Sequence, residues 1–191
     1  MEFREVVRRR RMVRRFAARP VDDTVLDRLL QIAQRGPSAG HTQPLELVVV
    51  RDEGLRRALG RASWSRGARP DAGAATVVFC GDLRRAAERY GGRGTGRYVF
   101  SDVAFAALLF LLGAVDEGLG AGYIGDFHEE HVQAVLGLPP PVVPVAMVIL
   151  GHRPEDDAVP TPRPRRPWRE AVHYDRFAPA HDWSARGLPP D

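Results

Sequence analysis

The amino-acid sequence predicts one soluble domain built from both helices and strands, and three observations predict it. The chain has 191 residues, which is the size of a single domain with one core. Hydrophobic residues make up 44% of the sequence and charged residues 27%, as in a soluble globular protein. Segments with a helical repeat of apolar residues alternate with short runs rich in β-branched residues.

The helical and strand patterns give the order of the elements. Apolar residues at helical spacing predict helices over residues 3–12, 23–35, 53–61, 98–117 and 128–136. Asp22 or Asp23 is expected to cap the second helix, and Gly137 to end the last. Strands are predicted over residues 45–50, 75–80 and 142–150, with a further short strand after a glycine-rich turn over residues 118–125. Residues 90–97, which hold four glycines, are predicted to form a mobile loop.

The positive charge of the chain is concentrated at its N-terminus. All 28 basic residues are Arg, and residues 1–19 hold eight of them against Glu2 and Glu5. A site for an anion must therefore use guanidinium groups, which bind phosphate with paired hydrogen bonds. A second basic cluster, residues 163–169, lies near the C-terminus.

Cysteine content and hydropathy indicate a cytoplasmic protein. A single cysteine, Cys80, excludes an intramolecular disulfide and fits a reducing compartment. The basic N-terminal segment is not followed by the apolar stretch of a secretory signal. The longest apolar run, residues 103–115, is shorter than the ~20 residues that cross a bilayer, so it is expected to be a core helix and no membrane partner is expected.

Two short motifs favour structural roles over cofactor or metal sites. Residues 120–125 match G-x-G-x-x-G, but a predicted helix precedes them and a strand follows, which is the reverse of a dinucleotide-binding unit. We therefore expect a tight turn there. His128 and His131 have helical spacing but no third ligand nearby in the sequence, so solvated side chains are expected and no metal site.

Several motifs, in order along the chain, resemble those of the FMN-dependent nitroreductase family. Residues 10–16 (RRMVRRF) resemble the opening R-R-S-x-R-x-F motif of that family, and residues 37–44 (PSAGHTQP) resemble its P-S-A-G-N-x-Q-P loop. Met12 stands where the family usually has Ser, and His41 where it usually has Asn. The resemblance continues through the long apolar helix and through residues 118–127, 135–139, 151–154, 163–167 and 172–174.

The resemblance implies an α+β fold, a nitroreductase-like sandwich in which a small, mainly antiparallel sheet is flanked by helices. It also implies an intertwined homodimer that holds FMN at its interface. The whole chain, residues 1–191, would be one FMN-binding domain, and residues 152–191 would form an extended tail that packs on the partner subunit. The apolar helix and a C-terminal segment rich in Pro and Arg both suit elements that face a partner.

The resemblance also assigns a cofactor site to this sequence. Arg10, Arg11 and Arg14 would bind the ribityl phosphate together with Arg163 or Arg165, and Met12 lies in the same motif. The flavin ring would be lined by Pro37, Ser38, Ala39, Gly40 and His41. Gly125 and Asp126 would offer backbone N–H groups near flavin N5 and O4. No catalytic side chain and no metal are expected, because the flavin carries the chemistry.

The implied activity is transfer of hydride from NADH or NADPH through flavin N5 to a small organic acceptor such as a nitroaromatic or a quinone. Two alternatives remain open. The chain could bind or store flavin without turnover, or, less favoured because residues 20–191 are slightly acidic, it could be a basic module for nucleic acid.

Overall fold

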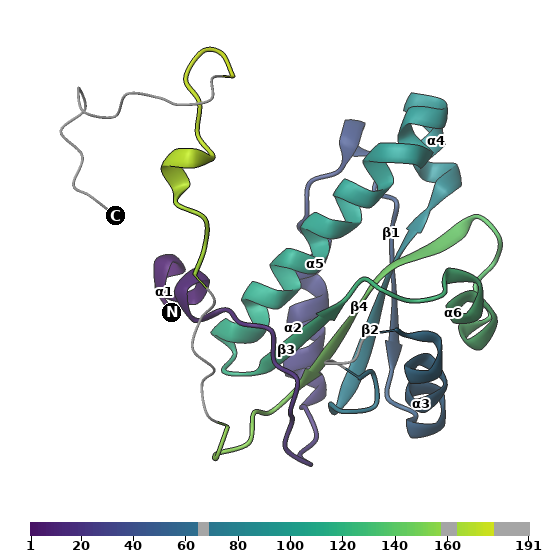
Figure 1. Cartoon of the computed structure of the whole chain (residues 1–191). Helices are drawn as coiled ribbons and strands as arrows, with labels where there is room; N and C mark the ends of the chain where they lie inside the picture. The colour runs from purple at the N-terminus through teal and green to yellow at the C-terminus, as the bar shows by residue number, and fades with distance from the viewer. Residues whose placement is uncertain (65–68, 158–163, 178–191) are drawn as a thin grey trace. The chain divides into compact units, whose positions relative to one another are not determined.

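A four-stranded antiparallel sheet forms the centre of the structure (Figure 1). The computed structural model describes residues 1–64, 69–157 and 164–177. The strand order is β1 (Leu45–Val50), β2 (Ala75–Asp82), β4 (Val142–Gly151) and β3 (Gly120–Ile124). β2 is buried along its whole length, whereas β1 and β3 are the edge strands. The α+β architecture with a small antiparallel sheet is therefore confirmed.

Helices cover both faces of the sheet, so the core has two layers. α2 (Asp23–Gln34) and α5 (Val99–Asp116) pack on one face, and α3 (Glu53–Ala62) and α6 (Glu129–Leu136) on the other. Successive residues of β2 alternate between the layers, since side chains in a strand point to opposite faces. Val77 and Phe79 join the α2/α5 layer, whereas Val78 and Cys80 join the other. Burial of each large apolar side chain contributes roughly 1.5–3 kcal/mol to folding.

Helix ends follow the capping residues in the sequence. Asp22 accepts a hydrogen bond from the Thr24 N–H at the start of α2, and Asp52 accepts one from the Leu55 N–H at the start of α3. Such caps contribute about 1 kcal/mol each. Gly137 ends α6 with a φ of 64°, a left-handed conformation that glycine adopts without strain.

The glycine-rich segment predicted to be a mobile loop is helical, so that prediction is wrong. α4 (Leu83–Arg93) runs into a short π-helix, η2 (Gly94–Tyr98), which leads directly into α5. Gly94 lies against the Ala86 carbonyl, where a Cβ atom could not fit. The glycine there permits close packing of two helical turns, a use that its turn-forming tendency does not reveal.

The apolar helix predicted over residues 98–117 is confirmed: it is α5, which is partly buried in the core. By length and composition, the continuous stretch Leu83–Asp116 could cross a membrane, but half of its most apolar window is buried within the structure. One side of α5 packs on the sheet through side chains such as Val103 and Phe110. Its other side is exposed, as described below.

The N-terminal segment crosses to the edge strand β3. α1 (Phe3–Arg9) is shorter than predicted and buries Val6, while Phe3 and Val7 stay exposed. Beyond α1 the chain is extended, and the Val13 N–H donates to the Ala121 carbonyl of β3 over 2.9 Å.

The motif at residues 120–125 is mainly strand, and the tight turn predicted there is limited to the residues around Gly118, whose φ is 73°. A Cβ at Gly120 or Gly122 would collide with Val13. These two glycines therefore let the N-terminal segment lie on β3.

The chain divides into two units, Met1–Asp157 and Ala158–Asp191. Residues 152–157 belong to the first unit: the Ala17 N–H donates to the His152 carbonyl, and Arg11 pairs with Asp157. In the second unit a single turn of 3₁₀-helix, η3 (Trp168–Glu170), lies among the described residues 164–177.

Candidate functional site

The first group of predicted site residues lies on the extended segment after α1. Within this segment Arg11 pairs with Asp157 at 2.8 Å and Arg15 with Asp156 at 3.6 Å. Arg10 and Arg14, in contrast, form no ion pair with any described residue, and Arg14 is exposed. Two guanidinium groups of this segment are therefore available to an anion.

Arg11 also carries a buried donor without an acceptor. Its Nη2 atom donates to Asp157, but within the described part of the chain its Nη1 atom has no hydrogen-bond partner. A buried donor left without a partner costs free energy, roughly 1–3 kcal/mol. An anion that reached Arg11 Nη1 would satisfy it, and Arg10 and Arg14 are close in sequence, so the chemistry of this segment fits a phosphate group. Met12, which lies between them in sequence, is exposed and adds no polar group.

The second group, Gly125 and Asp126, forms the turn at the end of β3. The Asp126 carbonyl accepts hydrogen bonds from the Trp64 N–H at 3.2 Å and from Ser63 Oγ at 3.3 Å, which fixes the turn against the end of α3. Within the described chain the Asp126 N–H has no backbone acceptor, so it is available to a ligand. A side chain at Gly125 would crowd the Tyr123 ring, 3.1 Å from its Cβ position.

The third group is the loop from Pro37 to Gln43, which includes the 3₁₀ turn η1 (Ala39–His41). Gly40, His41 and Gln43 have φ values of 55°, 59° and 48°, all left-handed. Two of these residues are not glycine, so the loop stores backbone strain, which clusters at functional sites. Side chains hold the loop in this shape, because Ser38 Oγ accepts from the Gln43 N–H and the His41 ring contacts the Gln43 amide.

Asp102 anchors this loop and was not predicted from the sequence. Its carboxylate, on α5, is buried and accepts a hydrogen bond from the Ala39 N–H at 3.0 Å. Burial raises the pKa of Asp102 above its usual value, and the hydrogen bond from Ala39 partly offsets the effect. The only sequence signal was an acidic residue at the boundary of a long apolar run.

The structure brings two of the three groups to one edge of the sheet and places the third at the opposite edge. The arginine segment lies beside β3 and the turn at Gly125 follows it, whereas the loop with Ser38 and His41 leads into β1. The strand order puts β1 three strand spacings from β3, about 14 Å. The three groups that are predicted to hold the flavin therefore do not lie together at one edge of the sheet.

The basic residues of the C-terminal segment are only partly described. Arg165 is exposed within the second unit, and Arg163 lies outside the described residues. Their predicted role at the phosphate remains a prediction.

Other reactive side chains do not form a competing site in the described chain. Burial raises the pKa of Cys80 to about 12, so its thiol stays protonated and unreactive at neutral pH. His128 and His131 are exposed, and no group of three metal-ligating side chains occurs among residues 1–64, 69–157 and 164–177.

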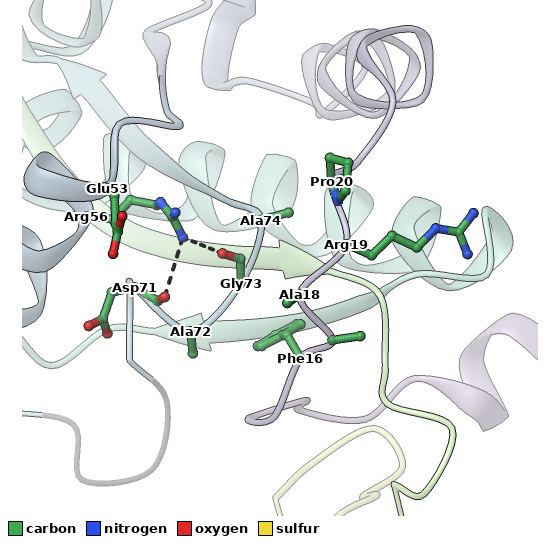
Figure 2. A pocket seen from close by; sticks show the side chains of 11 residues that line it. Phe16, Ala18, Arg19, Pro20, Glu53, Arg56, Asp71, Ala72, Gly73 and Ala74 are labelled. Atoms are coloured by element: carbon green, nitrogen blue, oxygen red, sulfur yellow. Dashed lines mark hydrogen bonds between the residues drawn. The ribbon is translucent and has the colours of Figure 1, made fainter.

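A hollow of about 350 Å³ lies away from the predicted site residues (Figure 2). It is bounded by the segment from Phe16 to Pro20 and by residues 71–74. Figure 2 shows Arg56 directed to the carbonyl oxygens of Asp71 and Gly73, both of which it contacts by hydrogen bonds. Because the Arg56 guanidinium already binds the backbone of residues 71–73, we assign the hollow no ligand.

Comparison with known sequences identifies relatives over most of the chain. A profile described as Nitroreductase family matches residues 7–152. An NADH dehydrogenase of Thermus thermophilus is 32% identical over 184 residues, covering 81% of this chain and 88% of its own. An NADPH-flavin oxidoreductase of Vibrio harveyi is 28% identical over 190 residues, covering 91% of this chain and 73% of its own.

Solved structures give the same result for the fold. A nitroreductase family protein from Clostridium novyi NT superposes with a TM-score of 0.74 and 26% identity, covering 81% of this chain and 87% of its own. The NADPH:FMN oxidoreductase from Vibrio harveyi, solved in complex with NAD⁺, superposes with a TM-score of 0.81 and 27% identity. The match covers 92% of this chain and 78% of that protein.

Proposed function

The chain belongs to the nitroreductase family and is an NAD(P)H-dependent oxidoreductase, and on this premise we propose that it binds FMN and reduces a small organic acceptor. Nitroaromatics and quinones are the acceptors we expect. When bound, FMN would supply two-electron hydride chemistry at its N5 atom. The chain's own residues bind, orient and shield the reacting groups.

In this proposal the arginine segment holds the phosphate of the cofactor. Arg10 and Arg14 offer guanidinium groups that pair with no described carboxylate, and Arg11 offers a buried donor that has no partner among the described residues. The Gly125 and Asp126 N–H groups donate to the polar edge of the ring, and the strained loop of Ser38, Ala39, Gly40 and His41, together with Pro37, lines its face.

The distance between the two sets of predicted flavin-binding residues is the main support for a homodimer. The loop before β1 and the arginine segment beside β3 lie at opposite edges of one sheet, which supports a shared site in which the loop comes from a second chain. The exposed side of α5 supports the same assembly. Phe100, Phe105 and Leu108 are 42%, 46% and 47% exposed, although a helix that is apolar on all sides is normally buried.

The C-terminal segment completes the proposed assembly. Residues 152–157 remain with their own chain, so the part that we expect to reach the partner begins at Ala158. Arg163 or Arg165 would then add a guanidinium group to the phosphate site. We expect the enzyme to act in the cytoplasm.

The absorption spectrum of the purified full-length protein tests the proposal. We expect a yellow protein that releases FMN on denaturation, is bleached by NADH or NADPH without oxygen, and regains its colour when a quinone or nitroaromatic is added. A yellow protein that neither dinucleotide bleaches would instead favour a flavin-binding or storage role. A colourless protein whose affinity for nucleic acid falls steeply with salt would favour the basic module.

A further inference from the structure

Four exposed or half-exposed side chains at the end of α4 form a cluster that the proposed function does not use. This Arg–Tyr cluster consists of Arg89, Tyr90, Arg93 and Tyr98. The two tyrosine rings meet edge to face, with centroids 5.0 Å apart and planes at 81°. The Arg89 guanidinium carbon lies 5.7 Å from the Tyr90 ring centroid and that of Arg93 lies 5.5 Å from the Tyr98 centroid, so each cation lies near an aromatic ring.

The Arg–Tyr cluster lies directly against the loop that we propose lines the flavin. Arg89 Nη1 donates to the Gly40 carbonyl at 3.5 Å. A Cβ at Gly40 would stand 2.6 Å from Arg89 Cδ and 2.9 Å from the Tyr90 ring, so only glycine fits this contact. A ligand that stacks on the flavin beside this loop can therefore extend onto the cluster.

The surface around the cluster carries unbalanced positive charge. Between Leu83 and Val99 the sequence has five arginines and a single acidic residue, Glu88. Arg84 has Asp82 as a partner at 3.7 Å, but Arg89, Arg93 and Arg97 form no ion pair with any described residue. Other arginines, such as Arg28 and Arg57, do have carboxylate partners.

The backbone beside these arginines is open. Cβ atoms added at Gly91, Gly92 or Gly96 would meet no atom within 4 Å. The space beside these three glycines, which lie between Arg89 and Arg97 in the sequence, is therefore open to a ligand.

We propose that the Arg–Tyr cluster, with Arg97, binds the adenosine 2′-phosphate end of NADPH and makes this enzyme prefer NADPH to NADH. The inference rests on the proposed function, in which Gly40 lines the face of the flavin and NADH or NADPH delivers hydride to that flavin. NADPH differs from NADH only by one phosphate, so preference for it needs positive charge beyond the flavin phosphate site. Guanidinium groups bind that phosphate with paired hydrogen bonds, and tyrosine rings offer a face for adenine.

Substitution of Arg93 tests the inference, because Arg93 is exposed and, unlike Arg89, donates no hydrogen bond to the flavin loop within the described residues. For wild type we expect kcat/KM for NADPH to exceed that for NADH by tenfold or more, and for Arg93→Gln we expect this ratio to fall about tenfold. The matched control is Arg57→Gln, an exposed arginine on α3 paired with Glu53, which should keep the wild-type ratio.

Binding of a fragment provides a readout without turnover. Adenosine 2′,5′-bisphosphate should bind the flavin-loaded protein, measured by calorimetry, and its affinity should fall about tenfold in Arg93→Gln but not in Arg57→Gln. Equal use of NADPH and NADH by wild type, or equal ratios in the two variants, would overturn the inference while leaving the proposed function intact. A protein that oxidises neither dinucleotide would overturn both.

Discussion

Arg14 is the residue whose contribution to cofactor binding can be isolated most cleanly, because it is exposed and pairs with no described carboxylate. Charge-assisted hydrogen bonds contribute roughly 1.5–3 kcal/mol, so Arg14→Ala should weaken FMN binding at least tenfold while the chain remains folded. Fluorescence titration of the flavin-free protein measures this effect. Riboflavin, which lacks the phosphate, should bind weakly to both proteins.

The control for this prediction is Arg57→Ala, since Arg57 lies on α3 and pairs with Glu53. Its affinity for FMN should equal that of wild type. If Arg14→Ala keeps its full complement of flavin through dialysis, Arg14 is not a phosphate ligand.

Asp102 gives a prediction about pH. Burial raises its pKa above the ordinary 3.8, so near that pH the folded chain binds a proton more readily than the unfolded chain. The contribution of Asp102 to stability is therefore greatest in acid, falls as pH rises through the raised pKa, and is level above it. The Asp102→Asn variant has no such titration, so the stability of wild type minus that of the variant should fall over this window.

Urea unfolding at a series of pH values, at one protein concentration, measures the difference. A difference that instead rises with pH would mean that the hydrogen bond from the Ala39 N–H stabilises the carboxylate more than burial destabilises it.

At the level of the element, α5 is apolar on both its sides but buries only one within its own chain. If the exposed side forms the subunit contact, Leu108→Asp places a charge in an apolar interface and should convert the dimer to a monomer. Flavin occupancy should fall with it, because the loop of the second chain is lost. Sedimentation velocity and the ratio of flavin to protein absorbance measure the two effects.

Leu55→Asp is the matched control, since Leu55 is 41% exposed on α3, on the other face of the sheet. It should leave both assembly and occupancy unchanged. A native monomer with one tightly bound FMN per wild-type chain would contradict the shared site.

At the level of the whole molecule, the C-terminal segment links assembly to cofactor binding. Deleting residues 163–191 removes the basic cluster and should lower both dimer stability and flavin occupancy. The dependence of dimer dissociation on protein concentration, compared between the full chain and the truncated chain, tests this. An unchanged dissociation constant with unchanged flavin content would show that the segment does neither.

Local patterns predicted most of the elements well. The strand Leu45–Val50 has the predicted bounds, and α3 and α6 differ from prediction by one residue at one end, because apolar periodicity and capping residues act over a few positions. Prediction failed at the glycines. Gly94 and Gly122 looked like turn formers, but Gly94 makes room for the Ala86 carbonyl and Gly122 for the Val13 carbonyl. Such close approaches depend on packing between segments rather than on turn propensity.

By itself the sequence determined most elements of this protein, though not α4, and the chemistry of its candidate ligands: guanidinium groups in one motif and a glycine-containing loop in another. Only the tertiary structure decided that these motifs lie at opposite edges of the sheet, that Asp102 is buried beneath the loop, and that one side of α5 keeps large apolar side chains exposed. The physical reason is the distance along the sequence over which each effect acts. Propensity and periodicity depend on residues within a few positions, whereas strand order and burial depend on contacts between segments far apart in the chain.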